Sequence, residues 1–387
     1  METKSLYEDR NGFLEMINAT LIKELIVTHP ELSESDYNDI IFKLAAHAKP
    51  MPETDKDLVV FPNGRFDRKI RGLVDTDRLA DMGFRDYNYL PPGKENEPVR
   101  FMKLLFDNVD GRDIPMIKAG LKSAVSRRLD SCISVIHGLS SVGKSAPLQI
   151  LCKCLGDYGL ILELDQFLEG RFIRAKIENK SLLVLQDLPK TWKNFAVLKA
   201  VTGEITKSER GFHSDMKSFD VKLKIWASAN YLAKVPSEEK NAMFTSRLSL
   251  IRNVRQEPYE KNNTFENNII EEEGEKIISW ILNIPDEDCH YEPSAVVQEN
   301  WERIASPELY FVRENYEVTS VEGGVSMTTA VLRREFQETT GKEVSMKVLT
   351  ATLRDEGYIV SYNSIKNITR KKVAPAETKS NGQSTLA

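Results

Sequence analysis

The sequence predicts an α/β fold, on the basis of three observations. Short apolar segments recur between residues 131 and 230, and each is followed by a loop or a helical pattern, as buried parallel strands are. A glycine-containing stretch joins the first segment to such a helical pattern. The composition, with 41% hydrophobic and 29% charged residues, is typical of globular proteins. A chain of 387 residues has room for two or three domains.

The N-terminal third is expected to be mainly helical. Apolar residues at helical spacing, such as Leu14 and Leu21, predict helices between residues 12 and 48. A strand with an Asn-Gly turn is expected at 58–67, and helix returns over 99–129. These patterns predict a helical N-terminal region (1–55) and a helical or linker region (56–129).

Strand candidates then follow one another at 131–137, 159–164, 181–185 and 222–228, and a helix is expected from about 144 to 155. A further helix after residue 271 ends at Pro285. This α/β domain is predicted over 130–288. Three helical stretches and a strand at 358–362 predict a C-terminal domain over 296–373, and the polar tail 374–387 is expected to be disordered.

The charge, the apolar pattern and the cysteines of the chain exclude some classes of protein and of site. The net charge of -5 gives no overall basic bias, so binding to nucleic acid would need a local patch. A charged N-terminus and the lack of a long apolar run predict neither a signal peptide nor a membrane span, and we expect a cytoplasmic location. Cys152 and Cys154 have neither zinc-site nor redox-motif spacing and are expected to be reduced structural thiols.

The most specific motif is a phosphate-binding loop between a predicted strand and a predicted helix. Glycine lets backbone N–H groups approach the phosphates closely, the lysine supplies charge, and the last serine ligates Mg²⁺. Pro147 is compatible with the helix that follows, because its first turn leaves N–H groups without intrahelical partners. ATP and Mg²⁺ are therefore the expected cofactors, and the expected ATP-binding residues are Gly138, Leu139, Ser140, Ser141, Val142, Gly143, Lys144 and Ser145.

Two polar residues end later strands of the same predicted sheet. Asp187 follows the strand at 181–185, where a carboxylate can hold Mg²⁺ together with Ser145; the alternative is an ordinary aspartate in the turn before Pro189. Asn230 follows the strand at 222–228, where its amide can orient an attacking water. With Lys144, these residues form the predicted catalytic set.

A basic hairpin and an arginine extend this set. Residues 211–219 predict a β-hairpin with its turn at Ser214-Asp215, and His213 and Lys217 are candidate DNA contacts; a solvated hairpin of mixed charge is the alternative. Arg247 can reach the γ-phosphate of a neighbouring subunit if the protein forms a ring, as a fourth catalytic residue. An intrachain salt bridge of Arg247 is the other interpretation.

The order of these pieces resembles the superfamily 3 helicases of the AAA+ class, of the poxvirus and phage or plasmid primase-helicase type. Besides the loop, the stretches that resemble the family are 61–67, with its Asn-Gly element, 198–204, 219–230 and 273–280. The resemblance covers about 58–285 and implies an AAA+ P-loop ATPase core. It implies a homo-hexameric ring that hydrolyses ATP between subunits and moves along single-stranded or forked DNA. It also implies that Asp187 is the Walker-B acid, Asn230 is sensor 1, and Arg247 is the arginine finger that acts on the nucleotide of the neighbouring subunit.

Two departures from the family matter. Gln186 stands where many members have the first of two acids, which leaves the identity of the catalytic base open. Residues 1–55 are too few for a primase domain, so primase activity is not expected in this chain.

The C-terminal pattern of helix, helix and strand is typical of a winged helix. Its second helix, 345–356, carries Lys347 and Arg354, and a basic stretch from Lys366 to Lys372 follows the strand. A protein-contact domain or a small helical cap is the alternative.

The sequence thus predicts a replicative DNA helicase of a virus, plasmid or mobile element, acting in the cytoplasm or in a host cell. Replication proteins such as a primase or polymerase are expected partners, and a membrane is not. Two alternatives remain open. One is an AAA+ ATPase that acts on protein or packages DNA without unwinding it. The other is an origin-binding initiator with weak turnover, which Gln186 favours.

Overall fold

The computed structural model describes residues 7–10, 13–16, 18–47, 53–126, 130–169, 177, 179–190, 192, 195–203, 206–210, 216–220, 223–259, 264–319, 325–361 and 363–371. The chain divides into two units, Met1–Gln298 and Glu299–Ala387. The expected hairpin turn at Ser214-Asp215 and the tail 374–387 lie outside the described residues. No helix in the described ranges has the length and apolar character that crossing a membrane requires.

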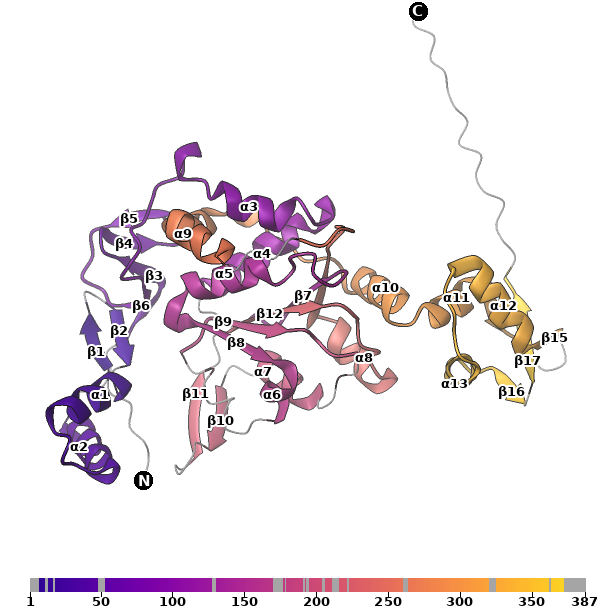
Figure 1. Ribbon diagram of the computed structural model, residues 1–387, viewed down its shortest axis with the longest axis horizontal. Coiled ribbons are helices and arrows are strands. Elements are labelled where there is room, and N and C mark those ends of the chain that lie inside the picture. Colours follow the sequence, from indigo (N-terminus) through magenta and orange to yellow (C-terminus); the bar gives the residue numbers. More distant parts are fainter. Residues whose placement is uncertain are drawn as a thin grey trace, which may run out of the picture. The chain divides into compact units, whose positions relative to one another are not determined.

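A five-stranded parallel sheet forms the centre of the first unit (Figure 1). Its strands lie in the order β13 (Leu248–Arg252), β7 (Ile133–His137), β12 (Lys224–Ala229), β9 (Leu182–Gln186) and β8 (Gly159–Glu163). All four neighbouring pairs are parallel. The predicted α/β class is confirmed, and four of the strands lie where the sequence predicted them. The sequence analysis did not identify β13.

Helices cover both faces of this sheet, as its strands require. Every residue of β12 is buried, and β7, β9 and β13 are each buried over four successive residues. A sheet of this kind is stable only when both faces are covered. In Figure 1, α4 (Ile114–Ala124) and α5 (Ala146–Cys154) lie on one face, with α9 (Phe265–Asn283) packed on α5, and α6 (Leu164–Glu169), α7 (Phe195–Gly203) and α8 (Ser237–Phe244) lie on the other.

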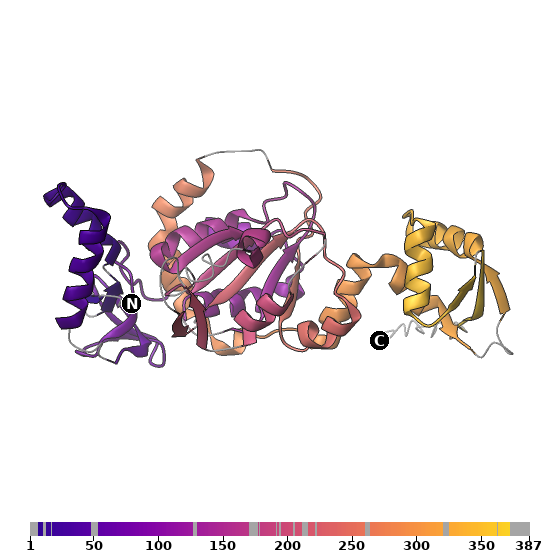
Figure 2. The ribbon, with the colours of Figure 1, turned by 90° about the horizontal axis from the view of Figure 1, so that it is seen from below.

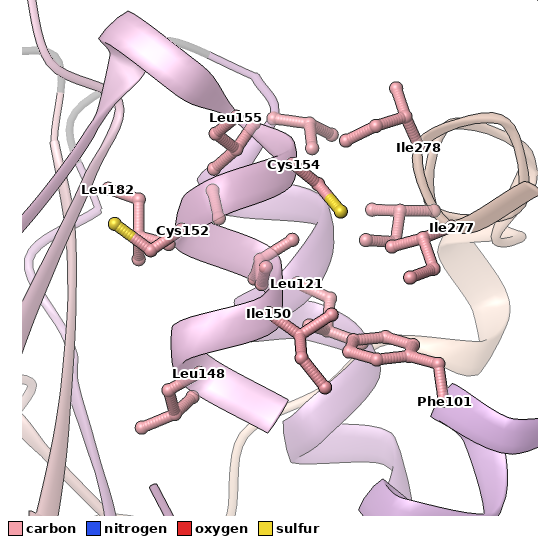
Figure 3. Packing of buried hydrophobic residues seen from close by; sticks show 14 of the residues in the cluster. Phe101, Leu121, Leu148, Ile150, Cys152, Cys154, Leu155, Leu182, Ile277 and Ile278 are labelled. Carbon is pink, nitrogen blue, oxygen red and sulfur yellow. The ribbon is translucent and has the colours of Figure 1, made fainter. Parts of the chain in front are cut away.

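Helix α5 buries most of its residues. Figure 3 shows its apolar side chains between Leu182 of β9, Ile277 and Ile278 of α9, and Phe101 of α3 (Val99–Phe106). Burial raises the pKa of the Cys152 thiol to about 11 and that of Cys154 to about 12. Both cysteines are free and protonated at neutral pH, as expected for structural thiols.

A six-stranded sheet precedes this core and corrects the prediction of helix at 13–16, where β2 lies. Its strands lie in the order β1 (Tyr7–Arg10), β2 (Phe13–Met16), β6 (Ala80–Gly83), β3 (Asp55–Phe61), β4 (Gly64–Asp67) and β5 (Gly72–Val74). Helices α1 (Asn18–Thr28) and α2 (Glu34–His47) follow the first hairpin. Pairing of β1 with β2, and of Phe13 with Ala80, outweighs the helical spacing of the apolar residues there.

The Asn-Gly turn between β3 and β4 forms where the sequence predicted it. Asn63 exchanges hydrogen bonds with the backbone of Tyr89, donating to its oxygen at 2.8 Å and accepting from its N–H at 2.9 Å. Tyr89 in turn packs on Phe61 and Phe66. The turn therefore fastens β3 and β4 to the loop that leads into α3.

Some predicted spans differ from the observed elements. The stretch 99–129 holds α3 and α4 with a 3-10 turn at Gly111–Asp113 between them, because Asp110 caps that turn. The helix expected after residue 271 begins earlier, at Phe265. The expected hairpin also begins earlier, with β10 (Thr206–Arg210) paired antiparallel to β11 (Met216–Asp220).

The second unit combines antiparallel strands with helices. Strand β17 (Ser364–Arg370) pairs with β14 (Tyr316–Val318), β15 (Val325–Thr328) and β16 (Ile359–Ser361). Helices α11 (Pro307–Asn315), α12 (Thr329–Thr340) and α13 (Met346–Asp355) pack beside them (Figure 2). The sequence predicted the strand at 358–362 and missed β14, β15 and β17; α10 (Ser294–Ala305) precedes these elements.

A buried ion pair joins three segments of the first unit at the amino end of the central sheet. Lys224, fully buried on β12, lies 3.0 Å from Asp130 and donates to Tyr291 Oη at 2.8 Å. Tyr291 donates to the same carboxylate at 2.7 Å. Lys224 lies in the basic region around the hairpin, but its burial removes it as a DNA contact.

The environment of Asp130 determines how this pair depends on pH. Burial alone would raise the pKa of Asp130, but the Lys224 ammonium and the hydrogen bonds from Tyr291 and the Cys132 amide hold it below its ordinary value of 3.8. A carboxyl whose pKa is lower in the folded state stabilises the protein above its unfolded pKa. That contribution is lost as pH falls through the folded value.

We expect Asp130→Asn to lower the free energy of unfolding by about 3–5 kcal/mol, because it leaves a buried ammonium without its counter-ion. Urea denaturation near pH 7 measures the loss. The double variant Asp130→Asn, Lys224→Met should recover most of it, because an apolar side chain replaces the charge. Glu299→Gln is the matched control in an exposed pair with Arg303 and should change stability by less than about 0.5 kcal/mol. A loss below about 1 kcal/mol for Asp130→Asn would contradict the interpretation.

Candidate nucleotide-binding site

The glycine-containing loop runs from the carboxyl end of β7 to the amino end of α5. Gly143 has a φ of 84°, in the region that glycine adopts without strain, and Ser141 has a φ of 63°. Gly138 lies so close to Asn253 that an added Cβ would come within 2.8 Å of its Cβ. Ser145 is the N-cap residue of α5. N–H groups of a glycine-containing loop that leads into a helix N-terminus are an arrangement that can bind an anion.

Lys144 is held inside the loop in this structure. It is only 6% exposed and donates to the oxygen of Leu139 and to Asn230 Oδ1, the latter at 2.7 Å. Burial lowers the pKa of Lys144, while the charge of Asp187 acts in the opposite direction. The structure therefore brings together Lys144 and Asn230, with Asp187 near enough to act on the ammonium.

A serine that the sequence analysis did not identify joins the two expected metal ligands. Ser145 Oγ donates to Ser228 Oγ at 3.0 Å, and the Asp187 N–H donates to the same oxygen at 3.4 Å. Asp187 has a φ of 47°, an uncommon conformation for a residue other than glycine. Backbone strain of this kind concentrates at functional sites. Ser228 is the last but one residue of β12, and a small hydroxyl at that place was its available signal.

The oxygen atoms of Ser145 and Asp187 fit a magnesium ion. Mg²⁺ prefers oxygen ligands, keeps several waters, and commonly uses one or two carboxylates together with substrate phosphates. Within the described residues no group of three or more His, Cys, Asp or Glu side chains could hold a metal ion. A magnesium ion beside Ser145 would therefore complete its coordination with phosphate and water.

Gln186 belongs to a different hydrogen-bond network. In the amide orientation of Gln149 that satisfies its neighbours, the Gln149 side-chain oxygen accepts a hydrogen bond from Gln186 at 2.6 Å. The Gln149 side-chain nitrogen then donates a hydrogen bond to Glu266 at 2.5 Å. Lys153 also binds Glu266, at 3.1 Å. Glu163 lies opposite Gln186 on β8 and is exposed. Asp187 and Glu163 are thus carboxylates available at neighbouring strand ends.

Arg247 does not lie with these residues. It directly precedes β13, whose first residue pairs with the first residue of β7, so it lies at the amino edge of the sheet, opposite the loop. Its Nη1 donates to the Ala242 oxygen at 2.7 Å, and its buried Nε has no hydrogen-bond partner among the described residues. A Cβ on Gly203 would come within 2.9 Å of its Nη2. Among the residues that the structure describes, Arg247 forms no salt bridge, and its guanidinium donates to a backbone oxygen.

The two candidate DNA contacts are described only in part. Lys217 lies on β11, with its Cα opposite that of Glu209 on β10. His213 lies outside the described residues. The hairpin forms a sheet of its own, separate from the central one.

Comparisons with known proteins give likeness at low identity. No protein-family model matches the sequence, and no curated protein matches it. The A form apo structure of the NrS-1 C-terminal region is 12% identical, with a TM-score of 0.48 over 96% of this chain and 95% of that chain. The A form of residues 305–718 of NrS-1 is 11% identical, with a TM-score of 0.47 over 94% of each chain. An apo structure of the same NrS-1 region is 10% identical, with a TM-score of 0.47 over 95% of each.

We expect Asp187→Asn to reduce ATP hydrolysis by about 100-fold while the chain still binds nucleotide, because the amide is a poor magnesium ligand. Steady-state phosphate release at increasing Mg²⁺ and binding of a non-hydrolysable ATP analogue measure the two effects. Glu163→Gln is the matched variant at the neighbouring strand end and should have a much smaller effect. Near-normal hydrolysis in Asp187→Asn, with loss in Glu163→Gln, would transfer the metal role to Glu163.

Proposed function

We propose that this chain is an ATP-driven DNA helicase of the superfamily 3 type, with an AAA+ core and a winged-helix C-terminal domain, that acts in the replication of a virus, plasmid or mobile element. The observation that carries the proposal is the meeting of Lys144, Asp187 and Asn230 at the carboxyl edge of one parallel sheet. Crevices at that edge are where open α/β sheets bind their ligands.

The order of the strands supports a role for each of these residues in the proposed hydrolysis. Strand β12 lies between β7 and β9, so Asn230 is placed between the loop and Asp187. Lys144 would leave Asn230 to bind the β- and γ-phosphates, which would free the amide to orient water. Ser145 and Asp187 would hold Mg²⁺, which supplies charge stabilisation of the transferring phosphate.

The DNA part of the proposal rests on the hairpin and on the second unit. In a ring, Lys217 of every subunit would face one channel, which concentrates charge in a chain of net charge -5. In the second unit, Lys347 and Arg354 are exposed on α13, and Lys366 is exposed on β17. A helix followed by a hairpin that carries Lys366 suits a DNA groove. Arg370 serves the fold instead, since it pairs with Glu335 at 2.6 Å.

A second candidate function is an origin-binding initiator with weak turnover. The amide network of Gln186 favours it, because a glutamine held by Gln149 supplies no carboxylate to activate water. Measured turnover distinguishes the two functions. An ATPase that acts on protein or packages DNA would hydrolyse ATP but separate no strands.

We expect the purified chain to hydrolyse ATP faster with single-stranded DNA and to displace a strand from a forked duplex only with ATP and Mg²⁺. Lys144→Ala should abolish both activities with an unchanged melting temperature, because it removes a phosphate cation. Lys217→Ala should keep DNA-independent hydrolysis and lose the stimulation. Its DNA affinity should also depend less on salt, by a log–log slope of about 0.7 for each lost phosphate contact.

The outcomes separate the candidates. ATP hydrolysis that DNA does not stimulate, with no strand displacement, would contradict the helicase and favour action on protein. DNA binding with only weak, unstimulated hydrolysis would favour the initiator. Near-normal hydrolysis in Lys144→Ala would contradict the nucleotide site itself.

Arg247 is proposed to act on the nucleotide of a neighbouring subunit. Arg247 lies away from the phosphate-binding loop of its own chain, so it can act on phosphate only in a neighbouring subunit. We expect Lys144→Ala and Arg247→Ala to be inactive alone and partly active when mixed, because an intact loop and an intact arginine then meet at some interfaces. ATPase assays across mixing ratios, with light scattering to verify the ring, measure the recovery. Rings that form without recovery would leave Arg247 as a structural residue.

A further inference from the structure

The segment from Asn253 to Tyr259 follows β13 and lies along the phosphate-binding loop. The Asn253 N–H donates to the oxygen of His137 at 2.8 Å, just before the loop begins. The Tyr259 N–H donates to the oxygen of Ser141 at 2.9 Å, within the loop. Both ends of this segment are therefore fastened to the loop by backbone hydrogen bonds, although more than a hundred residues separate them from it along the chain.

The Tyr259 ring packs against Gly143 of the loop. A Cβ added to Gly143 would come within 2.6 Å of ring carbon Cε2, so a larger residue there would displace the ring. The Arg255 guanidinium carbon lies 3.6 Å from the ring centroid, a stacked arrangement. Tyr259 remains 37% exposed. A flat pair of side chains thus borders the loop.

Neighbouring polar groups hold this pair in place. Asn108, 7% exposed, donates from Nδ2 to Tyr259 Oη at 2.9 Å, and its Oδ1 lies 3.5 Å from Arg255 Nη1. Arg255 also donates from Nε to the oxygen of Glu257 at 2.7 Å. The pair is therefore preorganised, and both polar atoms of the Asn108 amide already contact residues of this chain.

Nothing in the proposed hydrolysis uses Tyr259 or Arg255. A triphosphate held by the loop brings its nucleoside to the border of the loop, where a base needs an apolar surface. Bases stack on aromatic rings and on guanidinium planes. A ring that merely closed the loop would not need a guanidinium stacked on it or a buried amide to orient its hydroxyl.

We propose that Arg255 and Tyr259 form a nucleobase subsite, on which the base of a bound nucleoside triphosphate stacks. The proposal rests on the proposed nucleotide site. The Asn108 amide is committed to Tyr259 and Arg255, so among these three described residues the base is recognised by stacking. Stacking discriminates poorly between bases, so the subsite takes ATP and GTP with similar affinity.

Calorimetric titration of the full chain with three ligands, each with Mg²⁺, tests the subsite: a non-hydrolysable ATP analogue, the matching GTP analogue, and inorganic tripolyphosphate, which has no base. Tyr259→Ala should weaken the binding of both nucleotide analogues by roughly 5- to 150-fold, the range expected for the loss of base–aromatic stacking. It should leave the binding of tripolyphosphate unchanged. Tyr259→Phe should retain most of the affinity. Arg255→Ala should lose part of it while the ring stays on Gly143.

Tyr310→Ala is the matched control. Its ring is also covered by an arginine, Arg303, at 5.0 Å, and it lies on α11 in the second unit. This variant should bind all three ligands as the unchanged chain does. Melting temperatures verify that every variant is folded.

Failure of the subsite differs from failure of the nucleotide site. If Tyr259→Ala weakens tripolyphosphate as much as the nucleotides, or weakens none of them, Tyr259 supports the loop and the subsite is wrong. A preference of more than about tenfold for ATP over GTP would overturn recognition by stacking alone. If Lys144→Ala changes the affinity for none of the three ligands, tripolyphosphate included, the proposed nucleotide site itself is wrong.

Discussion

The parallel pairing of β12 between β7 and β9 is the constraint on which the site depends. His137 lies opposite Ala229, and Leu185 lies opposite Ala227, so the three strands end nearly level. The loop after β7, the turn after β9 and Asn230 after β12 therefore start from one edge. A slip of one residue in either pairing would move the side chains of a strand to the other face. Burial of both faces specifies the register.

Helix α5 connects that edge to the core. Its apolar residues lie between the sheet and α9, which positions the helix N-terminus and hence Ser145 (Figure 3). The loop before it, in which Val142 is buried, also has contacts from distant parts of the chain. Those contacts come from Asn253 and Tyr259 beyond β13, so the segment that follows this strand also shapes the loop after β7.

Two buried lysines at opposite edges of the same sheet have different partners. Lys224, at the amino end of β12, has a carboxylate partner 3.0 Å away and contributes to the joining of three segments. Lys144, beyond the carboxyl end of β7, donates to a backbone oxygen and to the neutral amide of Asn230. The first charge has a carboxylate in contact with it, whereas the second has neutral hydrogen-bond partners, with the Asp187 charge acting on it from farther away. A buried ammonium with only neutral hydrogen-bond partners suits phosphate binding.

Local patterns predicted much of the α/β unit because its strands are short, apolar and buried on both faces, and because a phosphate-binding loop has its own residue signature. Strands β1 and β2, whose pairing outweighs a helical pattern, and β13, which directly follows Arg247, were not predicted from the sequence. Ser228 and Tyr259 were missed because a serine in a strand or a tyrosine in a loop has no distinctive local signal.

The sequence by itself determined the fold class, the loop from Gly138 to Ser145, and the polar residues that end two later strands. These follow from spacing along the chain, which periodicity reports directly. Only the tertiary structure decided that Lys144 contacts Asn230, that Ser228 joins Ser145 to Asp187, and that Arg247 lies at the opposite edge. Each of these depends on strand order and register, which bring together residues that are far apart in sequence.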